Sequence, residues 1–174
     1  RADVQGESAY AFASASALLG NREYARVSDN LLNYSFNEYR DGVRNDPASP
    51  TYGLIGWAYT HKGTYYGDDN ARYLLGALGA TAYLGTDKYD RKIIEGILGN
   101  FRTSGTNGFR GGSLLDVDIQ RRGWQDYYHS PTVNLHPHFE SWLWACYLWL
   151  YAQSGEKELL ERVERGVSMM IAGY

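Results

Sequence analysis

Apolar positions recur along this chain with the period of α-helices in six segments. The segments span roughly residues 6–19, 22–37, 68–84, 87–102, 137–153 and 157–172. The first, third and fifth segments are apolar nearly all round, whereas the second, fourth and sixth carry their apolar residues on one face. The pattern predicts three helical pairs, each with one helix buried on most sides and one amphipathic helix that covers it.

A glycine ends the first helix of each pair. Gly20, Gly85 and Gly155 stand where the apolar pattern stops, and the next helix is expected to begin within a few residues. Glycine adopts the left-handed conformation of a helix C-cap without a steric penalty, so these positions predict tight antiparallel hairpins. The glycines are 65 and 70 residues apart, which is typical of a repeat architecture.

These hairpins predict one all-α domain over residues 1–174, with inner apolar helices packed side by side and wrapped by outer helices, as in part of an (α/α) toroid. No segment is convincing as a β-strand. The two links between hairpins are about 30 and 35 residues long, well beyond ordinary helix connections. Because the inner helices are expected to run parallel, both links reach the face where these helices begin, and functional residues are expected there.

Charge and composition exclude several classes of function. The formal charge is −3, with basic residues scattered among acidic ones, so the sequence predicts no nucleic-acid partner. No apolar run reaches the roughly 18 to 20 residues that a membrane span needs, which predicts no membrane partner. Cys146 is the single cysteine and lies in an apolar segment, so we expect a buried thiol. The sequence contains no Gly-x-Ser-x-Gly motif, so it does not predict acyl-transfer chemistry.

Four acidic residues stand at the expected starts of inner helices: Glu7, Asp68, Asp69 and Glu140. A helix N-terminus carries a partial positive charge, which holds a carboxylate ionised and aims it. Hydrolysis of a glycosidic bond requires one carboxyl group as proton donor and a second carboxylate as base or nucleophile. Asp68, Asp69 and Glu140 are therefore candidate catalytic residues, and capping of their own helices is the alternative for each.

Aromatic, cationic and imidazole side chains surround these acids in the links. The candidate substrate-binding residues are Trp57, Tyr65, Tyr66, Arg110, Trp124, His136 and His138. The rings can stack on sugars, Arg110 can clamp a uronic-acid carboxylate, and the histidines can bind hydroxyl groups. The alternatives are packing of the loops and capping of a helix. The alternate spacing of the histidines across Pro137 is too weak to predict a metal site, and neither metal nor cofactor is expected.

One stretch resembles known proteins. Residues 65–72 read Tyr-Tyr-Gly-Asp-Asp-Asn-Ala-Arg, and with Asn100-Phe101-Arg102 and Gly108-Phe109-Arg110-Gly111 they are similar to segments of bacterial glycosidase-like proteins. Over nearly its whole length the chain resembles the six-hairpin glycosidase superfamily, whose catalytic modules are (α/α)6 toroids. The resemblance implies acid/base hydrolysis of glycosidic bonds, with a sugar cleft at the N-terminal ends of the inner helices. It places cleft acids at Asp68, Asp69 and Glu140 and favours a secreted or periplasmic location.

The chain departs from that family in having three hairpins instead of six. Half a ring exposes the flanks of its inner helices, so the resemblance implies two partners: a carbohydrate, and either the rest of a longer chain or a second copy. Two other functions stay open. One is a helical domain that binds carbohydrate or serves as a scaffold without catalysis. The other is a sugar epimerase or isomerase with His136 or His138 as proton shuttle.

Overall fold

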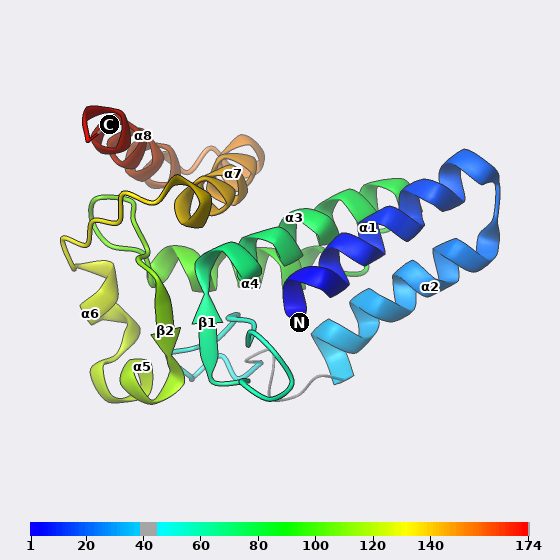
Figure 1. The fold of residues 1–174 in the computed structure, drawn as a ribbon, viewed down its shortest axis with the longest axis horizontal. Helices are drawn as coiled ribbons and strands as arrows, with labels where there is room; N and C mark the ends of the chain where they lie inside the picture. The colour runs from blue at the N-terminus through cyan, green and yellow to red at the C-terminus, as the bar shows by residue number, and fades with distance from the viewer. Residues whose placement is uncertain (39–44, 174) are drawn as a thin grey trace.

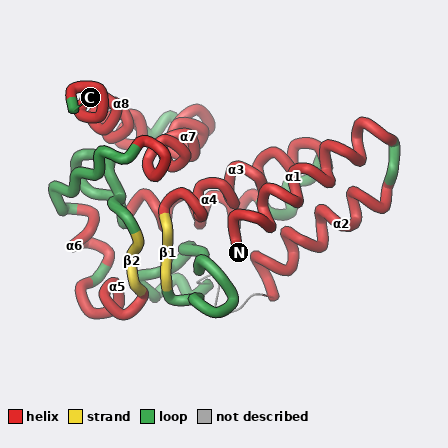
Figure 2. Tube along the Cα trace, viewed as in Figure 1, coloured by secondary structure: helices red, strands yellow, loops and turns green. Residues whose placement is uncertain are grey.

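The computed structural model describes residues 1–38 and 45–173, which are mostly helical (Figures 1 and 2). The long helices are α1 (Ala2–Leu19), α2 (Arg22–Asn33), α3 (Gly67–Leu84), α4 (Asp90–Arg102), α7 (Pro137–Ser154) and α8 (Lys157–Ala172). A π-helical turn, η1 (Tyr34–Glu38), extends α2. The all-α class and the six expected helices are confirmed, although α1 begins four residues earlier than the pattern predicted.

The glycine turns have the expected conformation. Gly20, Gly85 and Gly155 follow α1, α3 and α7 with φ of 66°, 63° and 72°. Each lies in the left-handed region that glycine adopts without strain. Every pair therefore closes as a short helical hairpin.

The three hairpins pack against one another through their first helices. Helix α3 packs along α1, whereas α7 crosses α3 near its beginning, so the expectation of parallel inner helices was wrong for α7 (Figure 1). Helices α2, α4 and α8 each pack against the helix that precedes them. One continuous core runs between them, with Leu74, Ile93, Leu143 and Tyr147 fully or almost fully buried. None of the helices in the described ranges is long and apolar enough to span a lipid bilayer.

Helices α1 and α3 approach each other most closely at two glycines. A Cβ on Gly76 would lie 2.4 Å from the carbonyl oxygen of Gly6, and a Cβ on Gly6 would lie 2.5 Å from that of Tyr73. Backbone cannot rotate away as a side chain can, so only glycine fits at this contact. The contact packs the beginning of α1 against residues 73–76 of α3.

Burial of the first helices differs from what their composition predicted. Helix α3 is buried on most sides, but α1 exposes Tyr10, Leu18 and Leu19, and α7 exposes Trp142. The prediction was wrong for one face of α7 and for α1, which only α2 and α3 contact extensively in the described part of the chain.

The two long links meet in a small sheet that the sequence did not predict. Strand β1 (Thr64–Tyr66) pairs antiparallel with β2 (Ser113–Leu115), and Tyr65 stands opposite Leu114. Three residues are too few for an alternating pattern to be recognised, so the expectation of no strand was wrong. The pairing confirms that both links reach the N-terminal end of α3 (Figure 1).

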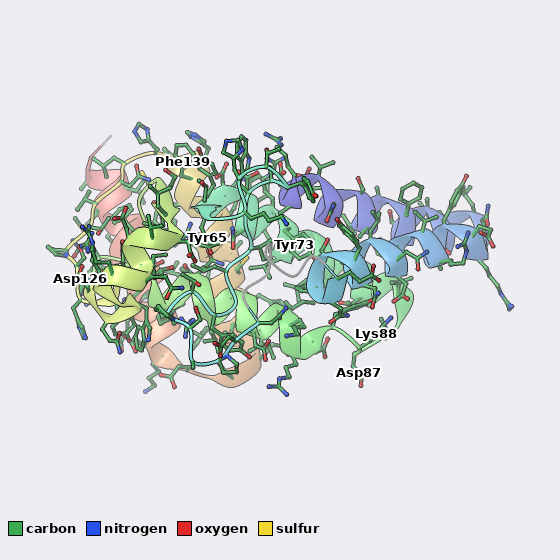
Figure 3. All side chains as sticks on the ribbon, turned by 90° about the horizontal axis from the view of Figure 1, so that it is seen from below. Tyr65, Tyr73, Asp87, Lys88, Asp126 and Phe139 are labelled. Carbon is green, nitrogen blue, oxygen red and sulfur yellow. The ribbon has the colours of Figure 1, made fainter. Side chains whose placement is uncertain are left out.

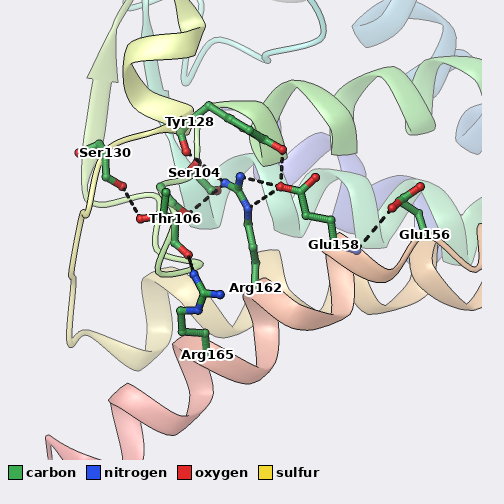
Figure 4. Close-up of polar contacts among 9 residues, drawn as sticks. Ser104, Thr106, Tyr128, Ser130, Glu156, Glu158, Arg162 and Arg165 are labelled. Atoms are coloured by element: carbon green, nitrogen blue, oxygen red, sulfur yellow. Dashed lines mark hydrogen bonds and ion pairs between the residues drawn. The ribbon is translucent and has the colours of Figure 1, made fainter.

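The second link also contains two short helices, α5 (Asp116–Arg122) and α6 (Trp124–Tyr128). Arg162 of α8 anchors the link, because its Nη1 donates hydrogen bonds to the carbonyl oxygens of Ser104 and Gly105 at 3.0 and 3.2 Å (Figure 4). The guanidinium group also packs over the ring of Tyr128, 3.8 Å from its centroid. The loops at the site are therefore tied to the outer layer.

Candidate functional site

A shallow depression of about 210 Å³ lies at the N-terminal end of α3. Its lining residues are Arg1, Trp57, Tyr66, Asp68, Asp69 and Phe139. They come from the beginning of α1, the first link, the beginning of α3 and the beginning of α7. Phe139, labelled in Figure 3, lies near the outer edge of the molecule. The starting ends of all three inner helices thus contribute to one surface.

Two aromatic rings of the first link are held at this depression. Tyr66 packs edge-on against Trp57, with ring centroids 5.5 Å apart. The backbone of Trp57 accepts a hydrogen bond from the Ala2 N–H at 3.0 Å and donates one to the Thr64 carbonyl oxygen at 2.8 Å. Both rings are half-buried, so each has a fixed position and keeps part of its surface open. Such rings suit the apolar faces of sugars.

Asp69 is the most perturbed acid at the site. Its side chain is almost buried, and its Oδ1 has no hydrogen-bond partner among the residues the structure describes. Burial raises the pKa of Asp69 from 3.8 to about 7, and the negative charges of Asp3 and Asp68 add to the shift while Arg1 opposes it. Near neutral pH this carboxyl group can therefore hold and release a proton.

Asp3 lies beside Asp69 and was not among the candidate residues predicted from the sequence. It is fully buried in the first turn of α1, where its Oδ2 forms ion pairs of 3.1 Å with Nη2 of Arg1 and with Nη1 of Arg72. Glu7, expected in that first turn, lies one turn further along and binds Nε of Arg72 at 2.8 Å. The expectation was wrong because α1 begins at Ala2.

A signal for the earlier start exists in the sequence. The small residues Ala2, Gly6, Ala9 and Ala13 repeat at helical spacing, and all four are buried. A stripe of small residues is a weaker periodic pattern than a stripe of large apolar ones, so the apolar pattern alone placed the start at residue 6.

Asp68 and Arg110 lie on neighbouring sides of the α3 start. Asp68 lines the depression, and its Oδ1 is buried with no hydrogen-bond partner in the described ranges. Arg110 is buried instead, and its Nη1 donates to the carbonyl oxygen of Tyr65 at 3.3 Å while its Nε donates to Oγ1 of Thr103 at 3.3 Å. Burial lowers the pKa of the Arg110 guanidinium. Its contacts match the loop-packing alternative and leave it outside the depression.

Glu140 is fully buried at the beginning of α7 and does not line the depression. Its carboxylate accepts hydrogen bonds from the backbone N–H groups of Arg110 and Gly111 at 3.0 and 3.1 Å, and from Nδ2 of Asn134 at 2.8 Å. Burial raises the pKa of Glu140, and these donors act in the opposite direction. The arrangement fixes the second link against α7.

The other candidate binding residues are distributed unequally. Tyr65 is buried and donates its hydroxyl to Oδ1 of Asp116 at 2.8 Å. Trp124 packs edge-on against Tyr128 on α6. His136 and His138 are exposed and contact the ring of Phe139, with centroid distances of 6.1 and 4.0 Å. The histidines therefore border the depression, whereas Tyr65 and Trp124 lie elsewhere.

Metal-binding chemistry has no support in residues 1–38 and 45–173, where no group of three or more His, Cys, Asp or Glu side chains can hold an ion. Cys146 is buried as expected, and burial raises the pKa of its thiol to about 12.

Comparisons with protein-family models, curated proteins and solved structures found no match.

Proposed function

We propose that this chain is a carbohydrate-active module that hydrolyses glycosidic bonds, with its catalytic acid in the depression at the start of α3. The observation that carries the proposal is Asp69, a nearly buried carboxyl group with a pKa of about 7 at the edge of a surface lined by aromatic rings. An acid that keeps its proton near neutral pH is what protonation of a leaving glycosidic oxygen requires.

The roles of the two aspartates follow from their surroundings. Asp69 donates its proton to the glycosidic oxygen as the bond to the anomeric carbon breaks. Asp68 lines the same depression and takes a proton from the water that attacks the anomeric carbon. Trp57 and Tyr66 supply ring faces for the sugar. We give Glu140 a structural role, because backbone N–H groups of the second link already donate hydrogen bonds to its carboxylate.

The proposal includes a partial (α/α) toroid. Three hairpins pack against one another, and Leu18 and Leu19 are exposed at the end of α1. Tyr10 of α1 and Trp142 of α7 are also exposed and line one apolar hollow over Leu75 of α3. These exposed apolar side chains support completion of the ring by another part of a longer chain or by a second copy.

The test is reducing-sugar release from a panel of neutral, amino and uronic polysaccharides by the wild-type protein and by Asp69→Asn and Asp68→Asn. Asp87→Asn is the matched control, because Asp87 is exposed at the opposite end of α3 (Figure 3). We expect Asp69→Asn to lose roughly 100-fold or more of the activity, the usual contribution of general acid catalysis, and Asp87→Asn to lose none.

Two outcomes would overturn the proposal. Undiminished hydrolysis by folded Asp69→Asn would remove this residue from the chemistry. Calorimetric binding of a polysaccharide that no preparation cleaves would identify a binding module, in which the rings act and the acids are structural.

A further inference from the structure

We infer that Asp3 is a positioning residue for Asp69: its buried carboxylate faces Asp69 from the neighbouring helix and keeps the one proton of the pair on the side of the depression. The inference rests on the proposed function in that it concerns the proposed acid. The carboxyl pair itself can nevertheless be measured without any substrate.

The pair follows from the packing of the helices. The contact of Gly6 with Tyr73 and Gly76 packs the beginning of α1 against α3, and Asp3 and Asp69, at the starts of these two helices, are 0% and 7% exposed. Each has one buried oxygen, Oδ1, with no hydrogen-bond partner in the part of the chain that the structure describes. Two ionised carboxylates in this position would repel each other with little screening, so the pair favours one shared proton.

Neighbouring cations decide which carboxyl group holds that proton. Arg1 and Arg72 both pair with Oδ2 of Asp3 at 3.1 Å and stabilise its ionised form. Asp69 has no ion pair among the described residues, and Asp68 adds a second negative charge beside it. The proton therefore belongs on Asp69.

Glu7 also carries a charge near the pair and binds Nε of Arg72 at 2.8 Å. Asp69 lines the depression, whereas Asp3 does not. Asp3 thus touches no substrate and acts only through its neighbour. Without it, the proposed acid would ionise at lower pH and lose its proton under working conditions.

The experiment is a ¹³C NMR titration of the aspartate carboxyl groups in the full chain, from pH 4 to pH 9. The Asp69 signal is assigned by its loss in Asp69→Asn. We expect its midpoint near neutrality in the wild type and at least one pH unit lower in Asp3→Asn, because removal of the Asp3 charge removes the repulsion. Asp87→Asn is expected to leave the midpoint unchanged.

An unchanged Asp69 midpoint in folded Asp3→Asn overturns the inference whether or not the protein is active. If Asp3→Asn does not fold, Arg72→Gln gives the second test. Loss of that cation changes the charge beside the pair and should move the Asp69 midpoint, and an unaltered Asp69 midpoint again overturns the inference.

Activity separates this inference from the proposed function. If a polysaccharide is cleaved, the alkaline limb of the pH–rate profile should move to lower pH in Asp3→Asn by the same amount as the NMR midpoint. A normal NMR shift with no hydrolysis of any polysaccharide would support the pair and reject the hydrolase. Hydrolysis with an unmoved pH profile would support the hydrolase and reject the role of Asp3.

Discussion

Gly6 of α1 and Gly76 of α3 lie backbone against backbone, so close that a methyl group on either would overlap the other helix. Side chains normally keep packed helices about 8 to 10 Å apart, and their absence here lets the two axes approach further. The consequence reaches the site: the same contact places Asp3 beside Asp69, although they are far apart in the sequence.

The first prediction concerns this contact. Gly76→Ala adds a Cβ that would lie 2.4 Å from backbone atoms of Gly6, which cannot move without shifting α1. Alanine gains about 1 kcal/mol of helix propensity over glycine, so the clash must outweigh that gain. We expect a net loss of about 1 to 3 kcal/mol in the free energy of unfolding, measured by urea denaturation.

Gly112→Ala is the control, because an added Cβ there meets nothing within 4 Å. It should change the stability by less than about 0.5 kcal/mol. A stabilised Gly76→Ala would show that the helices can separate without cost, and would argue against the close contact as the feature that aligns the two acids.

The hairpins could be predicted because their signals are local. Gly20, Gly85 and Gly155 each end a helix within a few residues of a clear apolar pattern, and all three turns have the expected conformation. Strands β1 and β2 have three residues each and depend on each other for pairing, so no single segment carries a recognisable pattern.

The candidate site could be predicted only in part, because burial depends on the whole fold. Asp69, Asp68, Trp57 and Tyr66 were found from their place before and at the start of α3, and all four line the depression. Arg110 and Glu140 have equally suggestive sequence contexts, yet both are buried by the second link. Asp3 could not be paired with Asp69 without the tertiary contact between their helices.

The second prediction concerns pH and stability. The pKa of Asp69 is raised to about 7 in the folded protein, so the folded state holds this proton more tightly than the unfolded chain. The stability contributed by the proton is fully present below about pH 4 and is lost as the pH rises through about 7. Asn resembles the neutral form of Asp. The free energy of unfolding of Asp69→Asn should therefore be about 1 to 3 kcal/mol higher than that of wild type at pH 8.

The measurement is the free energy of unfolding in urea at intervals from pH 4 to pH 8. The wild type should lose more stability over this range than Asp69→Asn, while Asp87→Asn should follow the wild type. Equal pH dependence in wild type and Asp69→Asn would mean that Asp69 ionises normally in the folded protein.

The third prediction tests Glu140 as an anchor of the second link. Glu140→Ala leaves the backbone N–H groups of Arg110 and Gly111 without their acceptor. An unsatisfied buried donor costs about 1 to 3 kcal/mol, so we expect a loss of about 2 to 4 kcal/mol in urea unfolding. Hydrogen exchange at these two amides should accelerate.

Glu161→Ala provides the comparison, since Glu161 is exposed on α8. It should stay within about 0.5 kcal/mol of wild type. A Glu140→Ala protein that keeps full stability but loses hydrolysis would return Glu140 to the catalytic residues.

The fourth prediction separates the two tryptophans of the links. Trp57 lines the depression with the acids, whereas Trp124 packs against Tyr128 on α6. If a sugar ring stacks on Trp57, Trp57→Ala removes about 1 to 1.5 kcal/mol of binding free energy. The Kd of the oligosaccharide should therefore rise roughly tenfold. The measurement is calorimetric titration of Asp69→Asn, with and without each tryptophan replacement, against oligosaccharides of the polysaccharide panel. Trp124→Ala should bind the oligosaccharide as tightly as its parent. Equal weakening by both replacements would indicate that the links have lost order in general and that Trp57 is not a specific stacking surface.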